Sequence, residues 1–119
     1  ARDNLLREGV AAAAIRVTGN TGVDALLAVA AEAPPPPIAL DPARRLVLVT
    51  AHRRESLDGG LDRVAAALAR LAARGDVQLA VALHRNPLAA RPMRDALAGL
   101  ANATLLPPLA HRDFVALLC

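Results

Sequence analysis

The sequence contains almost no aromatic residues. Phe114 is the single aromatic side chain, and tryptophan and tyrosine are absent. This excludes a row of rings on which the bases of a single-stranded nucleic acid stack, and we expect no nucleic-acid partner. Because 55% of the 119 residues are hydrophobic, the chain can still build the core of one modest domain, mainly from Ala, Leu and Val.

Lysine is also missing, and all 14 basic residues are arginine. The formal net charge of +3 is too small to indicate a polyanionic partner. A guanidinium group donates in pairs to phosphate or carboxylate oxygens. A few arginines can therefore be ligand contacts, while most belong to solvated helix faces.

Cys119 is the only cysteine, which excludes a disulfide framework and a cysteine-rich zinc site, and we predict no metal site. The apolar stretches are interrupted well short of the roughly 20 residues that a membrane-spanning helix needs. At the start, Asp3 and Glu8 replace the basic and then apolar regions of a signal peptide. We expect a cytoplasmic protein without membrane contact. The missing initial Met and the unfinished helical pattern at Cys119 indicate a piece of a larger chain.

Several common catalytic and phosphate-binding motifs are absent from the sequence. It has no GxGxxG, GxxxxGK[ST], GxSxG or CxxC segment, so a dinucleotide fingerprint, a P-loop, an esterase elbow and a metal knuckle find no support. No pair of carboxylates follows a predicted strand. Any acid and base pair for chemistry at a sugar must therefore come from outside this chain.

The first 42 residues form an irregular pattern. Residues 4–9 predict a short helix that ends at a glycine, residues 15–18 a short strand, and residues 23–32 a helix. The segment APPPPIALDP at 33–42 cannot continue a helix, since successive prolines prefer an extended geometry. It predicts a stiff connector.

After the connector, strand and helix patterns alternate. Continuous apolar runs predict buried strands, and apolar positions three and four apart predict helices. The strands are expected at 45–50, 77–83 and 103–106, and the helices at 61–73, 88–100 and 111–118. Short connections between such elements are typical of parallel sheets. The predicted fold class is α/β with a Rossmann-like parallel sheet.

All three histidines follow predicted strands. The first strand is followed by His52-Arg53-Arg54-Glu55, the second by His84-Arg85-Asn86 and the third by His111-Arg112-Asp113. Ligands of open α/β sheets bind beyond the carboxyl ends of the strands. If the strands are neighbours, these residues line one edge of the sheet.

The first of these groups has the parts of an anion site. Arg53 and Arg54 can donate to phosphate oxygens, and the following helix offers free N–H groups and a positive dipole. His52 can donate a hydrogen bond or transfer a proton, and Glu55 can orient an arginine or accept from a sugar hydroxyl. The same four residues also fit a solvated turn with an internal ion pair.

The other two groups have alternatives as well. Residues 84–87 also fit a turn in which Asn86-Pro87 begins a helix, and His111 with Asp113 fits the first turn of a helix. Phe114 fits a core position as well as a ring that packs on a base. Side-chain chemistry alone leaves these alternatives open.

Five segments together resemble a known family. NLLREGV, IRVTGNTGVDALL, LVLVTAHRRES, VALHRNP and LPPLAHRDFVALL, in this order, are similar to the non-hydrolysing UDP-N-acetylglucosamine 2-epimerases over nearly the whole chain. The resemblance implies a glycosyltransferase-B type fold, with two three-layer Rossmann-like domains and the active site between them. Residues 1–20 then correspond to the end of the N-terminal domain and the hinge, and residues 21–119 to the first half of the C-terminal, UDP-binding domain.

The resemblance also implies an activity. The family interconverts UDP-N-acetylglucosamine and UDP-N-acetylmannosamine by eliminating UDP and adding it back, for cell-envelope polysaccharide biosynthesis, without a cofactor and as a homodimer. The glycine-rich loop and carboxylates of the first domain, and a later serine and glycine segment of the second, are not in this chain. We therefore expect the chain alone to be inactive.

Site residues are implied by matching positions. His52 matches a catalytic histidine that contacts the nucleotide sugar, with Arg53 and Arg54 near the phosphates and Glu55 also in the substrate site. Leu109, through its backbone, and Phe114 match positions that flank the uracil. His84 matches a histidine that is linked, in bacterial members of the family, to a second, regulatory UDP-N-acetylglucosamine. Ala51 stands where glycine is common, Arg85 where the family varies, and Leu109 where a polar residue can occur, and none of these changes removes a titratable group.

Two functions from other classes stay open on the sequence. A glycosyltransferase of the same two-domain fold would use similar residues at the strand ends to transfer the sugar to an acceptor. A non-catalytic module that binds a nucleotide sugar would need no second domain. HRRES followed by HxNP one strand later favours the epimerase over the glycosyltransferase.

Overall fold

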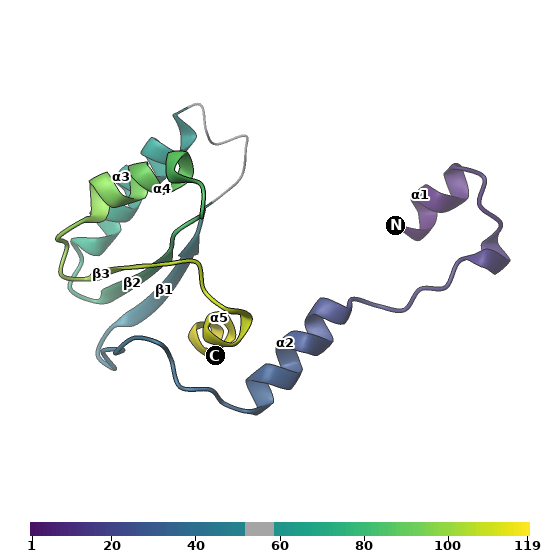
Figure 1. The fold of residues 1–119 in the computed structure, drawn as a ribbon, viewed down its shortest axis with the longest axis horizontal. Helices are drawn as coiled ribbons and strands as arrows, with labels where there is room; N and C mark the ends of the chain where they lie inside the picture. Colours follow the sequence, from purple (N-terminus) through teal and green to yellow (C-terminus); the bar gives the residue numbers. More distant parts are fainter. Residues whose placement is uncertain (52–58) are drawn as a thin grey trace.

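A parallel sheet organises the structure. The computed structural model describes residues 1–51 and 59–119. Its three strands are β1 (Arg45–Thr50), β2 (Val77–Ala82) and β3 (Ala103–Leu106), in the order β1-β2-β3 (Figure 1). Both pairings are parallel, and Ala82 stands opposite Thr50 on one side and Leu106 on the other. The predicted α/β fold with a parallel sheet is confirmed.

Helices cover both faces of this sheet. α3 (Gly60–Ala72) and α4 (Pro87–Leu97) lie side by side on one face, and α5 (His111–Leu118) lies on the other, as Figure 1 shows. α4 ends three residues earlier than its pattern predicted, and Gly99 follows with a φ of +79°. Such a left-handed residue cannot continue a helix. None of the helices in the described part of the chain has the length and apolar character needed to span a bilayer.

The larger part of the core lies between β2 and the α3–α4 layer. Side chains alternate along a strand, so Leu79, Val81 and Leu83 of the β2 segment face these helices. Leu83 continues the ladder one residue beyond β2, since its N–H donates to the Leu106 carbonyl at 2.9 Å. The buried residues of this cluster are Leu61, Ala65, Ala72, Val77, Leu79, Val81, Leu83, Ala89, Ala90, Met93 and Leu97.

A smaller cluster lies on the opposite face. Ala80 of β2 and Leu106 of β3 pack with Leu117 of α5. Ile38 from the proline-rich connector and Leu48 from β1 are partly buried against this cluster. The face is therefore covered by one short helix and by extended chain.

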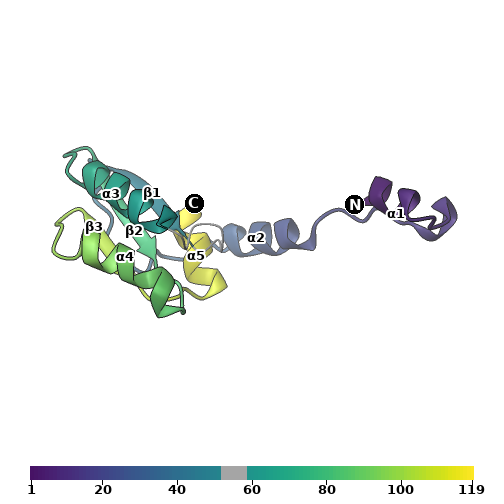
Figure 2. The same cartoon turned by 90° about the horizontal axis from the view of Figure 1, so that it is seen from above.

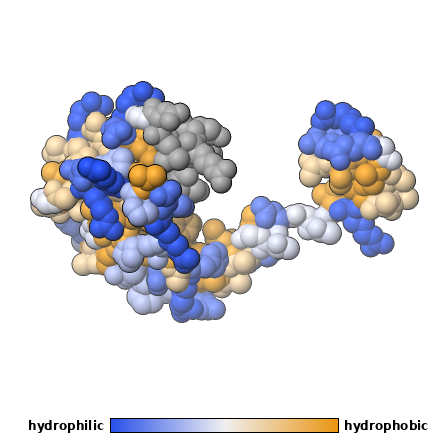
Figure 3. Space-filling model, turned by 45° about the horizontal axis from the view of Figure 1, so that its top comes forward, coloured by the Kyte–Doolittle hydropathy of each residue, from blue (hydrophilic) through white to orange (hydrophobic). Residues whose placement is uncertain are grey.

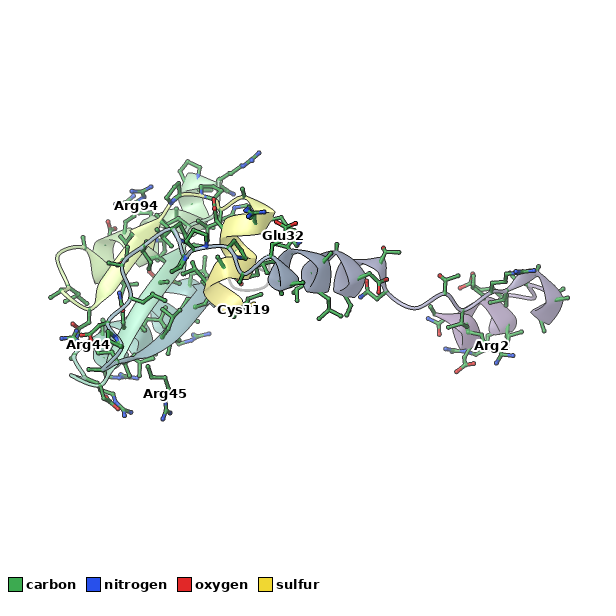
Figure 4. All side chains as sticks on the ribbon, turned by 90° about the horizontal axis from the view of Figure 1, so that it is seen from below. Arg2, Glu32, Arg44, Arg45, Arg94 and Cys119 are labelled. Carbon is green, nitrogen blue, oxygen red and sulfur yellow. The ribbon has the colours of Figure 1, made fainter. Side chains whose placement is uncertain are left out.

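The connector is fastened where the strands begin. The Gln78 side chain accepts from the Asp41 N–H at 3.0 Å and donates to the Ala39 carbonyl at 2.9 Å. Arg44, labelled in Figure 4, forms an ion pair of 2.9 Å with Asp41. Polar bonds thus hold residues 39–44 against the amino end of β2.

Asn102 extends this polar network to α3. Its side-chain amide donates to the carbonyls of Ala72 and Arg74, at 3.2 and 3.0 Å, and its oxygen accepts from Arg44. The bond to Ala72 satisfies one of the carbonyls that the end of α3 leaves without a helical partner. One side chain therefore joins the end of α3, the start of β3 and the connector.

The N-terminal residues form an arm that leaves the sheet. The arm consists of α1 (Arg2–Arg7), the 3-10 turn Ala12–Ala14 and α2 (Thr21–Ala31). Figures 2 and 3 show α1 set apart from the body, joined by a thin stretch of chain. α2 packs on α5, where Glu32 and Arg112 form an ion pair. This pair ties the end of α2 to the first turn of α5.

The strand predicted at residues 15–18 is not formed. This segment is extended, but none of the described residues pairs with it, and the Val17 side chain is 75% exposed. Strand formation needs a neighbouring strand to accept and donate the ladder bonds. The β-branched pattern was therefore insufficient, because it says nothing about the pairing partner.

Leu79 offers a test of the core. It lies on the central strand and is fully buried at 0% exposure, so Leu79→Ala is expected to lower the free energy of unfolding by about 2–5 kcal/mol. Leu118→Ala removes the same atoms from a side chain that is 49% exposed, and should change the free energy of unfolding by less than about 1 kcal/mol. Urea unfolding followed by circular dichroism measures both. Equal losses would contradict the assigned core.

The turn between α3 and β2 predicts a pH dependence. Arg74 donates to both Asp76 oxygens, at 2.9 and 2.7 Å, and these hydrogen bonds hold the pKa of the Asp76 carboxyl below its ordinary value. A lowered folded-state pKa stabilises the fold above the unfolded-state pKa of about 3.9, and this contribution is lost as the pH falls through the folded-state value.

Asp76→Asn is the matching variant. We expect it to be slightly less stable than the parent at pH 7, and the difference in stability should shrink as the pH falls through the folded-state pKa of Asp76. Thermal unfolding of the two proteins across this range measures the difference. The effect should be small, because the pair is exposed to solvent. A difference that stays constant with pH would show that the ion pair does not cause it.

Candidate functional site

A pocket opens at the carboxyl edge of the sheet. Its volume is about 300 Å³, and its walls come from three parts of the chain. Thr50 ends β1 and is followed by Ala51, Ala82 ends β2 and is followed by residues 83–84, and Leu109 and Phe114 come from the segment after β3 and from α5. The pocket therefore lies where the topology of an open α/β sheet places its ligands.

The alternation of side chains explains the floor of the pocket. Leu48 and Ala80 pack under α5, so Thr50 and Ala82, two residues further along, point to the same face. Thr50 and Ala82 are also direct partners in the β1–β2 register. Because the Ala82 side chain is a single methyl group, it leaves space between its neighbours. This space is the floor of the pocket.

His84 is held by the turn that starts α4. Its Nδ1 accepts a hydrogen bond of 3.0 Å from the Asn86 N–H, which places the proton of the neutral ring on Nε2. Nε2 is then a donor. The Asn86 side chain caps α4 by accepting from the Leu88 N–H at 3.0 Å. Pro87 follows at the first helical position, where a missing N–H costs nothing.

The opposite wall is apolar and comes from the segment after β3. Two prolines, Pro107 and Pro108, end the strand, since they have no N–H to donate to a ladder. Leu109 follows, partly buried, and Ala110 then precedes α5. The Phe114 N–H donates to the Ala110 carbonyl at 3.0 Å, and its ring lines the pocket. Phe114 is partly buried and is not among the fully buried core residues, and a base packed on its ring stays a prediction.

The structure brings three of the predicted site residues together. His84, Leu109 and Phe114 are up to 30 residues apart in the sequence and line one pocket. The predicted residues His52, Arg53, Arg54 and Glu55 lie outside the described residues. Their segment, 52–58, joins Ala51 in the pocket wall to Gly59 at the start of α3.

The third histidine group does not reach the pocket. His111 begins α5 and is exposed, and Arg112 binds Glu32 of the arm. The alternative interpretation of 111–113, the first turn of a helix, is therefore correct. Thr50 and Ala82 were not predicted as pocket residues. Their signal was their position at the ends of the first two strands on the α5 face, which depends on the register.

Among the lining residues that the structure describes, His84 is the only one with a titratable side chain. The described walls therefore combine one imidazole and one hydroxyl with alkyl groups and a single ring. Within residues 1–51 and 59–119, no group of three or more His, Cys, Asp or Glu side chains is placed to hold a metal ion. The described walls can bind and orient a ligand and donate hydrogen bonds, but they contain no carboxylate.

A second hollow, of about 360 Å³, lies at the opposite edge of the sheet. It is lined by the connector and by Arg44, Gln78 and Asn102. These side chains already bond to one another or to backbone groups, as described above. Their hydrogen-bonding groups are engaged in holding the fold, so this hollow is structural.

Comparison with known proteins decides the family. The family model described as UDP-N-acetylglucosamine 2-epimerase matches residues 1–119. The chain belongs to the UDP-N-acetylglucosamine 2-epimerase family. The resemblance seen in the five sequence segments is confirmed.

Curated relatives extend over much longer chains. The sequence is 43% identical to a probable UDP-N-acetylglucosamine 2-epimerase of Ralstonia nicotianae, over 98% of this chain and 34% of that protein. It is 38% identical to the UDP-N-acetylglucosamine 2-epimerase of Yersinia pestis, again over 98% and 34%. The chain thus spans about a third of the length of these relatives.

Solved structures of the epimerase family share the fold. The UDP-GlcNAc 2-epimerase of Neisseria meningitidis, crystallised bound to UDP-GlcNAc, superposes with a TM-score of 0.87 at 28% identity, over 98% of this chain and 34% of that one. A putative UDP-N-acetylglucosamine 2-epimerase of Listeria monocytogenes gives 0.76 at 33% identity, over 98% and 32%. The arm and the sheet are therefore arranged as in a segment of an epimerase.

Proposed function

We propose that this chain forms part of the UDP-binding domain of an enzyme that interconverts UDP-N-acetylglucosamine and UDP-N-acetylmannosamine. One observation carries the proposal: in a member of this family, His84, Leu109 and Phe114 line one pocket at the carboxyl edge of the sheet. The Neisseria relative, which has the same fold over this segment, was crystallised with UDP-GlcNAc.

The uracil would occupy the side of the pocket formed by Leu109 and Phe114. An aromatic ring packs well on the flat face of a base, and the backbone of Leu109 can pair with the polar edge of uracil. A volume of about 300 Å³ lies at the lower end of the range of about 300–1,000 Å³ for small-molecule sites. This size suits one part of the nucleotide sugar, with the rest extending out of the pocket.

The diphosphate would extend toward residues 52–58 and the start of α3. In this proposal Arg53 and Arg54 donate to phosphate oxygens, Glu55 helps to hold the substrate, and His52 acts on the nucleotide sugar as the catalytic residue. The chain connection supports the placement, since Ala51 of the pocket wall directly precedes His52. His84 would contact a second, regulatory UDP-N-acetylglucosamine beside the substrate.

The proposed reaction has two steps. A base removes the proton at C2 of the sugar while the C1–O bond breaks, and the electron pair of that bond leaves with UDP to give a 2-acetamidoglucal. UDP then adds back at C1, and C2 receives a proton on the opposite face. This chain's share is to hold the leaving group. The described pocket walls contain no carboxylate, so the base for C2 is assigned to other parts of the enzyme.

We also propose the division of the chain into two parts. Residues 1–20 would complete the N-terminal domain and the hinge, and residues 21–119 would form the first half of the C-terminal domain. The exposed apolar side chains of Leu5, Val10 and Val17 support this, because the arm would bury them against a neighbouring domain. The full-length enzyme is proposed to be a cytoplasmic homodimer that serves cell-envelope polysaccharide biosynthesis.

Phe114 tests the uracil site. In the full-length protein, Phe114→Ala should weaken UDP binding about tenfold or more, since stacking of a base on an aromatic ring contributes about 1–3 kcal/mol. Leu118→Ala, on the same helix but outside the pocket, is the control and should leave the affinity unchanged. Isothermal titration calorimetry with UDP measures both. An unchanged affinity of the Phe114→Ala variant would remove uracil from this wall.

Turnover in D₂O tests the reaction. The full-length protein should convert UDP-N-acetylglucosamine to UDP-N-acetylmannosamine with deuterium at C2, because the removed proton exchanges with solvent. The 119-residue chain alone, at a third of the relatives' length, should give no product. Proton NMR follows both samples. Epimerisation by the isolated chain would contradict the proposed division of roles. Epimerisation without deuterium uptake would contradict the removal of the proton at C2.

A further inference from the structure

We infer that Thr50 is a further substrate-binding residue, which donates a hydrogen bond to a diphosphate oxygen of the bound UDP group. The inference rests on the proposed function. It starts from the position of Thr50, the last residue of β1, which is exposed and lines the pocket. Thr50 lies inside the LVLVTAHRRES segment, but no role was assigned to it from the sequence, because a threonine at the end of an apolar strand is ordinary.

The face of the strand fixes where Thr50 points. Leu48, two residues earlier, packs into the cluster under α5, and Thr50 therefore faces the α5 side beyond that cluster. Its partner Ala82 lies beside it with only a methyl group, and His84 follows Ala82 two residues further along the chain. Thr50 and His84 thus both line the pocket next to Ala82.

The Thr50 hydroxyl is available to a ligand. Within the part of the chain that the structure describes, this hydroxyl takes part in no hydrogen bond, while its backbone continues the β1–β2 register. The β-branched shape alone suits a strand, and valine would serve that purpose equally well. The hydroxyl therefore distinguishes threonine from valine at this position, and none of the described residues binds it.

The chemistry of the two walls decides which part of the ligand Thr50 meets. The apolar wall of Leu109 and Phe114 suits the base, and it belongs to the β3–α5 side of the pocket. Thr50 belongs to the β1 side, three and four residues before Arg53 and Arg54. A hydroxyl on this side can donate to an anionic oxygen, and such bonds to charged groups are stronger than neutral ones.

Removing only the hydroxyl tests the inference in the full-length protein. Thr50→Val is nearly isosteric and should weaken UDP binding about tenfold, with KM for UDP-N-acetylglucosamine raised more than kcat is lowered. Thr50→Ser keeps the hydroxyl and should bind UDP nearly as the parent does. Thr104→Val is the matched control, since Thr104 lies in β3 opposite Ala80 and does not line the pocket.

Uridine distinguishes the contacted group. It lacks the phosphates, so Thr50→Val and the parent should bind it equally, as measured by ligand-observed NMR. Parental UDP affinity of Thr50→Val would overturn the inference, as would equal losses in Thr50→Val and Thr104→Val or a loss that extends to uridine. Thr50→Ala provides a second variant without the hydroxyl, and it should lose UDP affinity as Thr50→Val does.

The result is separable from the test of the function itself. If the parent binds UDP and Phe114→Ala weakens it while Thr50→Val does not, the UDP site stands and only the role of Thr50 fails. If the parent protein binds no UDP, the proposed function and this inference fail together.

Discussion

The parallel pairing of β2 with both neighbours is the constraint on which the rest of the structure depends. Parallel strands require crossover connections, and these bring the carboxyl ends of all three strands to one edge. β2 is also buried on both faces. One set of its side chains packs on α3 and α4, and the other set packs under α5 and then opens into the pocket. A shift of one residue would exchange these two sets and would remove both the core and the pocket floor.

The two edges of the sheet have opposite characters. At the amino edge, Gln78, Asn102 and Arg44 bond to one another or to the backbone and close the structure. At the carboxyl edge, Thr50 ends β1, Ala82 ends β2 and His84 follows it. All three line the pocket, and α5 contributes Phe114 to another wall. Members of this fold class place ligands at the carboxyl edge, and here the polar groups of the amino edge are already engaged.

Much of the fold could be predicted from the sequence, because buried parallel strands and amphipathic helices have different periods. The outcome at residues 15–18, where the predicted strand is not formed, could not, because a local pattern says nothing about a pairing partner. Of the site, His84 and Phe114 were predictable from strand ends and from the family resemblance. Thr50 and Ala82 were not, because neither side chain suggests a ligand contact within its segment, and only the register shows that they share a face with His84.

The proline-rich connector has a mechanical consequence. One end is attached to α5 through the ion pair of Glu32 with Arg112, and the other end is attached to β2 through Gln78. The four prolines between these attachments prefer an extended polyproline geometry, so this part of the connector acts as a semi-rigid spacer. The connector thus links the sheet to α5, the helix that carries Phe114. The connector therefore restrains α5 relative to the sheet, although none of its residues is among the described residues that line the pocket.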